Sequence, residues 1–151
     1  MITLLETLKV CDHHANRLRW AMSRLQAHFP LTGYSLNQLE DLEIAILDQF
    51  STRFAKLQDQ MGASLFPAVL ELTKEQGNLK AFIDKLHRLE KIGALASAED
   101  WLLMREVRNS FSHDYPDDPE LQAQMLNKAY QLADGLLEVF AAIKVFIKPY
   151  L

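Results

Sequence analysis

The chain has 151 residues, of which 49% are hydrophobic and 24% are charged, and its formal net charge at pH 7 is −4. These values are typical of a single globular domain with one well-buried core, and they exclude a disordered chain. The net negative charge excludes a general basic surface for nucleic acid, so any RNA binding must come from a local patch.

Targeting signals are not evident in the sequence. No apolar stretch is long enough to span a membrane, and the N-terminal residues lack the uninterrupted apolar core of a signal peptide. We therefore expect a cytoplasmic protein without membrane association. The single cysteine, Cys11, cannot form an internal disulfide, which agrees with a reducing compartment. Its position in an apolar helical stripe indicates a buried thiol rather than a nucleophile.

The first half of the chain predicts two long helices. The first covers about residues 2–28, where apolar residues alternate at spacings of four and three and so form one seam for packing in a bundle. The second is predicted to begin at Ser35, with Gln38 three residues later in a capping-box arrangement. It continues to Leu72, with a kink or break expected near Gly62 and Pro67. A helix of this length exceeds what a small core needs, so part of it is expected to face a second copy of the chain.

The second half predicts three further helices. One covers about residues 79–92, and the next begins after the capping residue Ser97. The last begins at Asp118 and Pro119, a capping residue followed by a proline at the first helical position, and continues to Ile147. The sequence therefore predicts an all-α, up-and-down bundle of about five helices, a single domain over residues 1–151, which we expect to be dimeric.

Most cofactor signatures are missing. The sequence contains no His-Glu-x-x-His or Glu-x-x-His pair, no glycine-rich phosphate loop, no nucleophile elbow and no dinucleotide-binding fingerprint. The adjacent His13 and His14 project to different sides of a helix and are interpreted as surface or boundary residues. We therefore expect neither a metal nor a cofactor.

Polar side chains gather at the end of the fourth predicted helix, in the segment REVRNSFSHDY. Arg108 and His113 are five residues apart, so an unbroken helix would point them about 140° away from each other. Pro116 disfavours helical geometry at Tyr115, and we therefore expect the helix to unwind there. His113 can then fold back toward the face of the helix that carries Arg108.

These residue types are sufficient for cleaving RNA without a metal. An arginine such as Arg108 can hold a phosphate through two hydrogen bonds, and a histidine such as His113 can transfer a proton near neutral pH. Asn109 can orient either partner. In this interpretation Arg108, Asn109 and His113 are catalytic, and Arg105 and Ser112 contact the substrate.

A purely structural interpretation of the same residues is also open. A histidine near a helix C-terminus interacts favourably with the helix dipole, which would account for His113. Arg108 could pair with Asp114, Asp117 or Asp118. The motif would then only end a helix.

The segment RNSFSHDY resembles the motif of the HEPN superfamily, and within it the HepT-like toxins, also described as nucleotidyltransferase substrate-binding proteins. That motif is an arginine, four to six residues and a histidine at the end of a late helix, often with a polar residue after the arginine. Arg108, Asn109 and His113 fit it, and Tyr115 fits the longer form of the HepT-like members. The chain length and the helical layout agree over essentially the whole chain.

The resemblance implies a homodimer in which two motifs face one cleft and act as a metal-independent endoribonuclease. It also implies a partner, an MNT-type nucleotidyltransferase antitoxin, which in some systems adds AMP to the motif tyrosine, here Tyr115. The alternative within the resemblance is a non-catalytic binding partner that presents substrate to a nucleotidyltransferase or regulates it.

Overall fold

The computed structural model of the chain describes residues 3–75, 77, 79–111 and 117–151. Over these residues the chain is helical and has no strand, which confirms the predicted all-α bundle. The elements are α1 (Leu4–Leu25), the 3-10 turn η1 (Gln26–His28), α2 (Gly33–Asn37), α3 (Asp41–Gln60), the π-helical turn η2 (Met61–Leu65), α4 (Phe66–Leu72), α5 (Phe82–Lys91), α6 (Ala98–Ser110), α7 (Pro119–Ile147) and the 3-10 turn η3 (Lys148–Tyr150).

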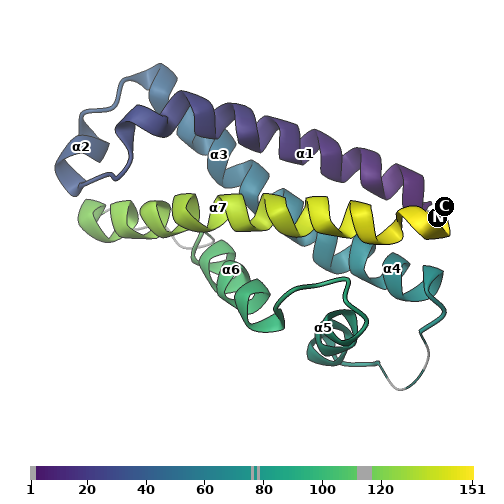
Figure 1. Cartoon of the computed structure of the whole chain (residues 1–151). Helices are drawn as coiled ribbons and strands as arrows, with labels where there is room; N and C mark the ends of the chain where they lie inside the picture. The colour runs from purple at the N-terminus through teal and green to yellow at the C-terminus, as the bar shows by residue number, and fades with distance from the viewer. Residues whose placement is uncertain (1–2, 76, 78, 112–116) are drawn as a thin grey trace.

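The long helices α3 and α7 run in the same general direction and α1 runs opposite to both, and both chain termini lie at the same end of the molecule (Figure 1). The shorter helices α5 and α6 lie to one side of this layer, with α6 packed against both α3 and α7. None of the helices in the described part of the chain has the length and apolar character needed to cross a membrane.

Two of the predicted helix starts are confirmed. The Ser97 hydroxyl accepts a hydrogen bond from the N–H of Asp100 at 3.1 Å and so begins α6. The Asp118 carboxylate accepts from the N–H of Leu121 at 3.0 Å and begins α7, with Pro119 at the first helical position. Each cap satisfies an N–H group that the helix itself leaves without an acceptor.

The predicted start of the second helix at Ser35 is wrong. Thr32 caps a separate short helix, α2, and Ser35 accepts a hydrogen bond from the N–H of Thr32 at 2.8 Å instead of beginning the long helix. The long helix α3 begins after Glu40, whose N–H donates to the Glu43 carboxylate at 2.9 Å. The capping boxes that form are therefore the two neighbouring ones, and the pattern Ser35-x-x-Gln38 does not begin a helix.

Residues around α2 dock onto the first turns of α7. The side-chain amide of Asn127 makes two hydrogen bonds with Leu31, accepting from its N–H at 2.7 Å and donating to its carbonyl at 2.8 Å. The N–H of Gly33 donates to the Glu120 carboxylate at 2.7 Å. These bonds close one end of the bundle and keep the start of α7 in place.

The predicted interruption of the second helix is confirmed at η2. Here the N–H of Phe66 donates to the carbonyl of Met61, five residues earlier, which is the π-helical register. Pro67 follows in the first turn of α4 and has no N–H to offer the carbonyl of Ala63. The proline therefore explains why the α-helical ladder is interrupted at this position, where α3 passes α6.

The interior is one continuous hydrophobic core in which the largest fully buried side chains are Trp101, Phe50, Phe54, Phe66 and Phe140. Cys11 is fully buried in it, as predicted. Burial is the main cause that raises the pKa of the Cys11 thiol to about 12, and the neighbouring Asp12 carboxylate adds to it. At neutral pH this thiol is therefore protonated and shielded from reagents.

We predict that Cys11 will not react with a disulfide reagent such as Ellman's reagent at pH 8 while the chain is folded, because the reactive thiolate is absent and solvent does not reach the sulfur. Addition of guanidinium chloride should release one equivalent of chromophore as the chain unfolds. Rapid stoichiometric reaction of the native protein would contradict the burial described above.

Candidate functional site

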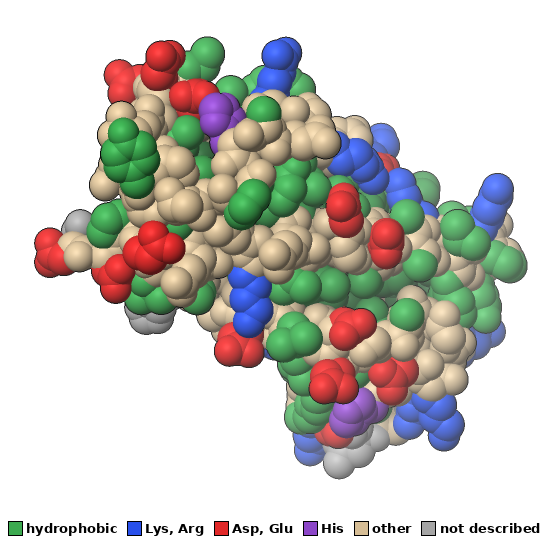
Figure 2. All heavy atoms as spheres, turned by 60° about the vertical axis from the view of Figure 1, so that its left-hand side comes forward, with side chains coloured by type: hydrophobic (Ala, Val, Ile, Leu, Met, Phe, Trp, Pro, Cys, Tyr) green, Lys and Arg blue, Asp and Glu red, His purple; other side chains and the backbone are tan. Residues whose placement is uncertain are grey.

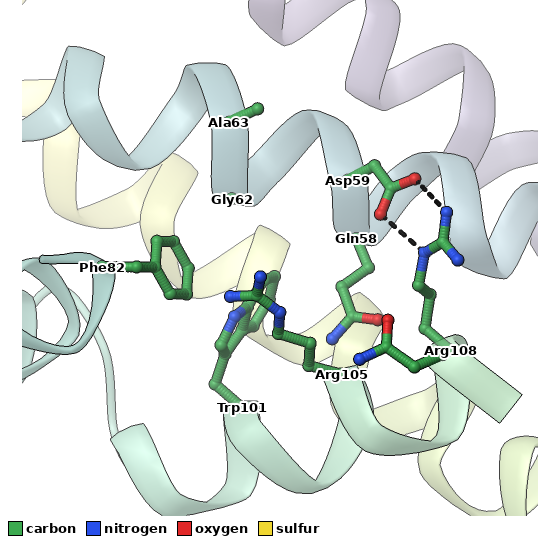
Figure 3. Close-up of a pocket in the computed structure, with 9 residues that line it drawn as sticks. Gln58, Asp59, Gly62, Ala63, Phe82, Trp101, Arg105 and Arg108 are labelled. Atoms are coloured by element: carbon green, nitrogen blue, oxygen red, sulfur yellow. Dashed lines mark hydrogen bonds and ion pairs between the residues drawn. The ribbon is translucent and has the colours of Figure 1, made fainter.

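A pocket of about 510 Å³ lies where η2 passes α6, and the start of α5 closes one side of it (Figure 3). This volume is in the range of small-molecule binding sites. The lining residues come from the end of α3, from η2, from α5 and from α6: Gln58, Asp59, Gly62, Ala63, Phe82, Trp101, Arg105, Arg108 and Asn109.

Arg108 stands at one end of the pocket and is held by the carboxylate of Asp59 from α3. Its Nε donates to Asp59 Oδ1 at 2.8 Å and its terminal nitrogen donates to Oδ2 at 2.7 Å, so the guanidinium and the carboxylate meet edge to edge. The hydrogen bond to Asp59 is the main cause that raises the pKa of Arg108. The same two-pronged geometry is the one in which arginine binds a phosphate.

The Asp59–Arg108 ion pair is open to solvent. The Arg108 side chain is 28% exposed and that of Asp59 is 52% exposed. Exposed pairs contribute about 0–1 kcal/mol to stability, because water screens the charges and two side chains must be ordered. Loss of the pair is therefore expected to change the stability of the fold little.

Arg105 lies on the ring of Phe82 from α5, with 4.7 Å between the guanidinium carbon and the ring centroid. Its backbone is held by Gln58, which is 3% exposed. With its amide oriented to satisfy both of its ends, Gln58 donates to the carbonyl of Met104 at 3.1 Å and accepts from the N–H of Arg105 at 2.7 Å. Gln58 thus fixes α6 against α3 from inside the core.

Trp101 forms the inner wall of the pocket and carries an unpaired donor. The residue is 1% exposed, and its indole Nε1 has no hydrogen-bond partner among the described residues. A buried donor without an acceptor costs about 1–3 kcal/mol. Gly62 lies opposite: a Cβ placed there would be 3.7 Å from the Trp101 ring and 3.5 Å from Phe82, so the glycine leaves this part of the pocket open.

Three of the predicted site residues meet at this pocket. Arg105, Arg108 and Asn109 all line it. His113, Ser112 and Tyr115 lie outside the described residues. The structure thus brings Arg105, Arg108 and Asn109 to one pocket, and the predicted roles of all six residues stay predictions.

The structural interpretation expected Arg108 to pair with one of the aspartates that follow it in the sequence. Of the following aspartates, Asp117 and Asp118 are described, and Arg108 pairs with neither. Its partner is Asp59, which precedes it by 49 residues on another helix. Asp114 lies outside the described residues. The guanidinium of Arg108 is therefore used to join two helices.

The other wall residues were not predicted as part of the site. Gln58, Asp59 and Trp101 are not among the site residues that the sequence predicts. The one signal near them was Gly62, whose position in an otherwise apolar helical pattern predicted an interruption. Periodicity alone could not show that this interruption faces Arg105 and Arg108.

His14, one of the paired histidines, has a structural contact. Its Nδ1 lies 2.9 Å from the guanidinium of Arg53 on α3. Burial, together with the charge of Arg53, lowers the pKa of His14, so the neutral ring accepts the hydrogen bond from the arginine. In the described part of the chain, no three His, Cys, Asp or Glu side chains lie close enough to hold a metal ion.

The face shown in Figure 2 carries acidic and basic side chains side by side, with no single broad basic area. A local site such as the Arg105–Arg108 pocket is therefore the kind of place where an anionic ligand would be bound.

Comparison with protein-family models, with curated proteins and with solved structures found no match to the chain.

We predict that Asp59→Asn will lower the free energy of unfolding by no more than about 1 kcal/mol, because the lost ion pair is exposed. The same change should strengthen the binding of pyrophosphate, since Arg108 loses its internal anion. The measurement is the rise of the thermal midpoint as pyrophosphate is added.

Asp48→Asn is the matched control, because it removes the same charge from an exposed position of α3 that does not line the pocket. Equal stabilisation of both variants by pyrophosphate would mean that net charge, and not the release of Arg108, is responsible.

Proposed function

We propose that the chain is a metal-independent endoribonuclease of the HEPN type, the toxin of a toxin–antitoxin pair, acting as a homodimer. The observation that carries the proposal is the two-pronged hold on Arg108 at the rim of a pocket, directly before the segment that completes the motif. A phosphodiester can take the place of the Asp59 carboxylate because both present two oxygens to the same guanidinium edge.

In the proposed reaction the ribose 2′-hydroxyl attacks the adjacent phosphorus. The bond from O2′ to phosphorus forms and the bond from phosphorus to O5′ breaks, which leaves a 2′,3′-cyclic phosphate and a 5′-hydroxyl. His113 of one chain removes the proton of the 2′-hydroxyl. The protonated His113 of the second chain in the dimer donates a proton to O5′. Arg108 stabilises the charge that develops on the phosphate, and Asn109 orients the reacting groups.

A second candidate is the non-catalytic binding partner of a nucleotidyltransferase. The observation that favours it is the ion pair within the chain, because Asp59 already neutralises the charge of Arg108. Such pairing is expected where the arginine does not bind a phosphate. The two candidates predict different results for the purified chain, because only the ribonuclease cleaves RNA when no partner is present.

We predict that Arg108→Ala will lower the rate of RNA cleavage about a hundredfold or more, because stabilisation of the transition-state charge is lost. His113→Ala should lower it by about 10²- to 10⁴-fold, because a general acid–base group is lost. The measurement is cleavage of a labelled single-stranded RNA in the presence of a metal chelator, together with relief of growth arrest in cells.

Arg19→Ala is the control, because it removes an exposed arginine of α1 that does not line this pocket. Circular dichroism of each variant checks that the helices are kept. Unchanged cleavage by folded His113→Ala protein would contradict the ribonuclease proposal, and tight binding of a nucleotidyltransferase by a chain that cleaves no RNA would favour the second candidate.

We predict that an MNT-type nucleotidyltransferase and ATP will add one or more AMP units to the chain at Tyr115, by attack of the tyrosine hydroxyl on the α-phosphate with release of pyrophosphate. The added phosphate would occupy the anion site next to Arg108 and stop RNA cleavage. Intact mass spectrometry measures the modification, and an equal mass shift in Tyr115→Phe protein would assign it to another residue.

A further inference from the structure

The outer side of α1 carries basic side chains around one exposed tryptophan. Five exposed residues follow one another at spacings of four, four, three and four, so they share one face of the helix over about 21 Å. These residues, which we call the basic stripe, are Lys9, His13, Arg17, Trp20 and Arg24. The stripe contains no carboxylate, although the whole chain has a net charge of −4.

The two acidic residues of α1 do not neutralise the basic stripe, because each is used elsewhere. The Glu6 carboxylate accepts from the N–H of Thr3 at 2.9 Å and caps the start of the helix. Asp12 pairs with Lys144 of α7 at 2.8 Å. Among the described residues, the ion pairs with carboxylates include no cation of the stripe. Its charges therefore remain available to an anionic partner.

Trp20 lies at the centre of two cation–π contacts. The guanidinium carbon of Arg17 is 4.9 Å from the ring centroid and that of Arg24 is 5.7 Å from it, while the tryptophan stays 37% exposed. A guanidinium that lies over a ring keeps its N–H groups at its edge, where they can bind both oxygens of a carboxylate. Tryptophan and arginine are also the residue types that contribute most to protein–protein interfaces.

The flank of α3 adds positive charge beside the basic stripe. A terminal nitrogen of Arg53 lies 2.9 Å from Nδ1 of His14, and Lys56 is exposed three residues further along α3. Burial, followed by the charges of Arg53, His13 and Lys56, lowers the pKa of His14. The combined effect of these cations on one imidazole indicates a positive potential along this side of the molecule, which attracts anions.

Carboxylates fit the basic stripe better than nucleotides do. The guanidinium groups of Arg17 and Arg24 lie over Trp20, in the position where a nucleobase would have to stack. The stripe is also separate from the pocket that contains Arg108, because α1 and α6 lie on opposite sides of α7 (Figure 1). An acidic helix laid along α1 would present its carboxylates at the same helical spacing as the cations.

We propose that the basic stripe docks an acidic helix of a partner protein. Two carboxylates that are two turns apart on this helix pair with Arg17 and Arg24, and an apolar side chain between them packs against Trp20. The inference goes beyond the proposed function and does not depend on it, since it concerns a different surface and holds whether or not the chain cleaves RNA.

The experiment is fluorescence anisotropy of a labelled synthetic peptide titrated with the full chain. The probe is an alanine-based helical peptide of about 20 residues with a glutamate every seventh residue and a leucine four residues after each glutamate. The control peptide has the same composition, but its glutamates are distributed around the helix. The patterned peptide should bind about tenfold or more tightly, and its affinity should fall as salt is added.

Two variants test the contacts. The double variant Arg17→Gln, Arg24→Gln should weaken binding about tenfold or more, because two charge pairs across the interface are lost. Its matched control is Arg19→Gln, Lys128→Gln, which removes the same charge outside the stripe and should bind as the wild type does. Trp20→Ala should also weaken binding about tenfold or more. Circular dichroism checks that each variant keeps its helices.

Equal affinity for the two peptides, failure of both to bind, or unchanged affinity in the folded double variant would overturn the proposal. Two further measurements test other occupants of the stripe. A single-stranded 2′-O-methyl RNA that binds more tightly than the patterned peptide, and loses affinity in the double variant, would make the stripe a nucleic-acid site. A wild-type dimer that the double variant separates into monomers in sedimentation would assign the stripe to a second copy of the chain. Either result would overturn the proposal.

RNA cleavage by the double variant separates this inference from the proposed function. We expect cleavage to equal that of the wild type while peptide binding is lost. Absence of cleavage in the wild type together with pattern-dependent peptide binding would refute the ribonuclease proposal and support the docking surface. Cleavage without pattern-dependent peptide binding would do the reverse.

Discussion

The candidate site depends on two consecutive residues at the end of α3 that hold α6. The amide of Gln58 bridges the backbone of α6 at Met104 and Arg105 inside the core, and the carboxylate of Asp59 binds the guanidinium of Arg108 at the surface. Because neighbouring helical residues point about 100° apart, the two contacts hold α6 at different places and restrict its rotation. In this orientation of α6 both arginines line the pocket beside η2.

The two contacts differ in strength because they differ in exposure. Loss of the Gln58 amide would remove two buried hydrogen bonds to the backbone of α6, each contributing about 0.5–1.5 kcal/mol. The Asp59–Arg108 pair is open to solvent and contributes about 0–1 kcal/mol. The core contact therefore keeps the helices together, while the surface contact can be exchanged. An anion that displaces Asp59 would leave the packing of α6 unchanged.

Several locally unfavourable features lie around the same pocket. The chain changes to π-helical hydrogen bonding at Met61–Leu65, places Gly62 inside this turn and gives the Trp101 donor no acceptor among the described residues. Each of these reduces the stability of an isolated helix or of the core. Natural sequences concentrate such departures from local rules at functional sites. Their coincidence with two arginines in one pocket is the physical basis for treating this region as a binding site.

The sequence by itself determined the all-α class, most helix ends and the arginine part of the motif, because apolar periodicity and capping residues act over a few neighbouring positions. It misplaced the start of the long helix at Ser35, since capping patterns at Thr32, Ser35 and Glu40 all lie within 32–43 and the local sequence does not rank them. Only the tertiary structure decided that Arg108 meets Asp59 and that Trp101 faces Gly62. Periodicity shows which side of a helix is buried, but packing of whole helices sets which polar groups of two helices face each other.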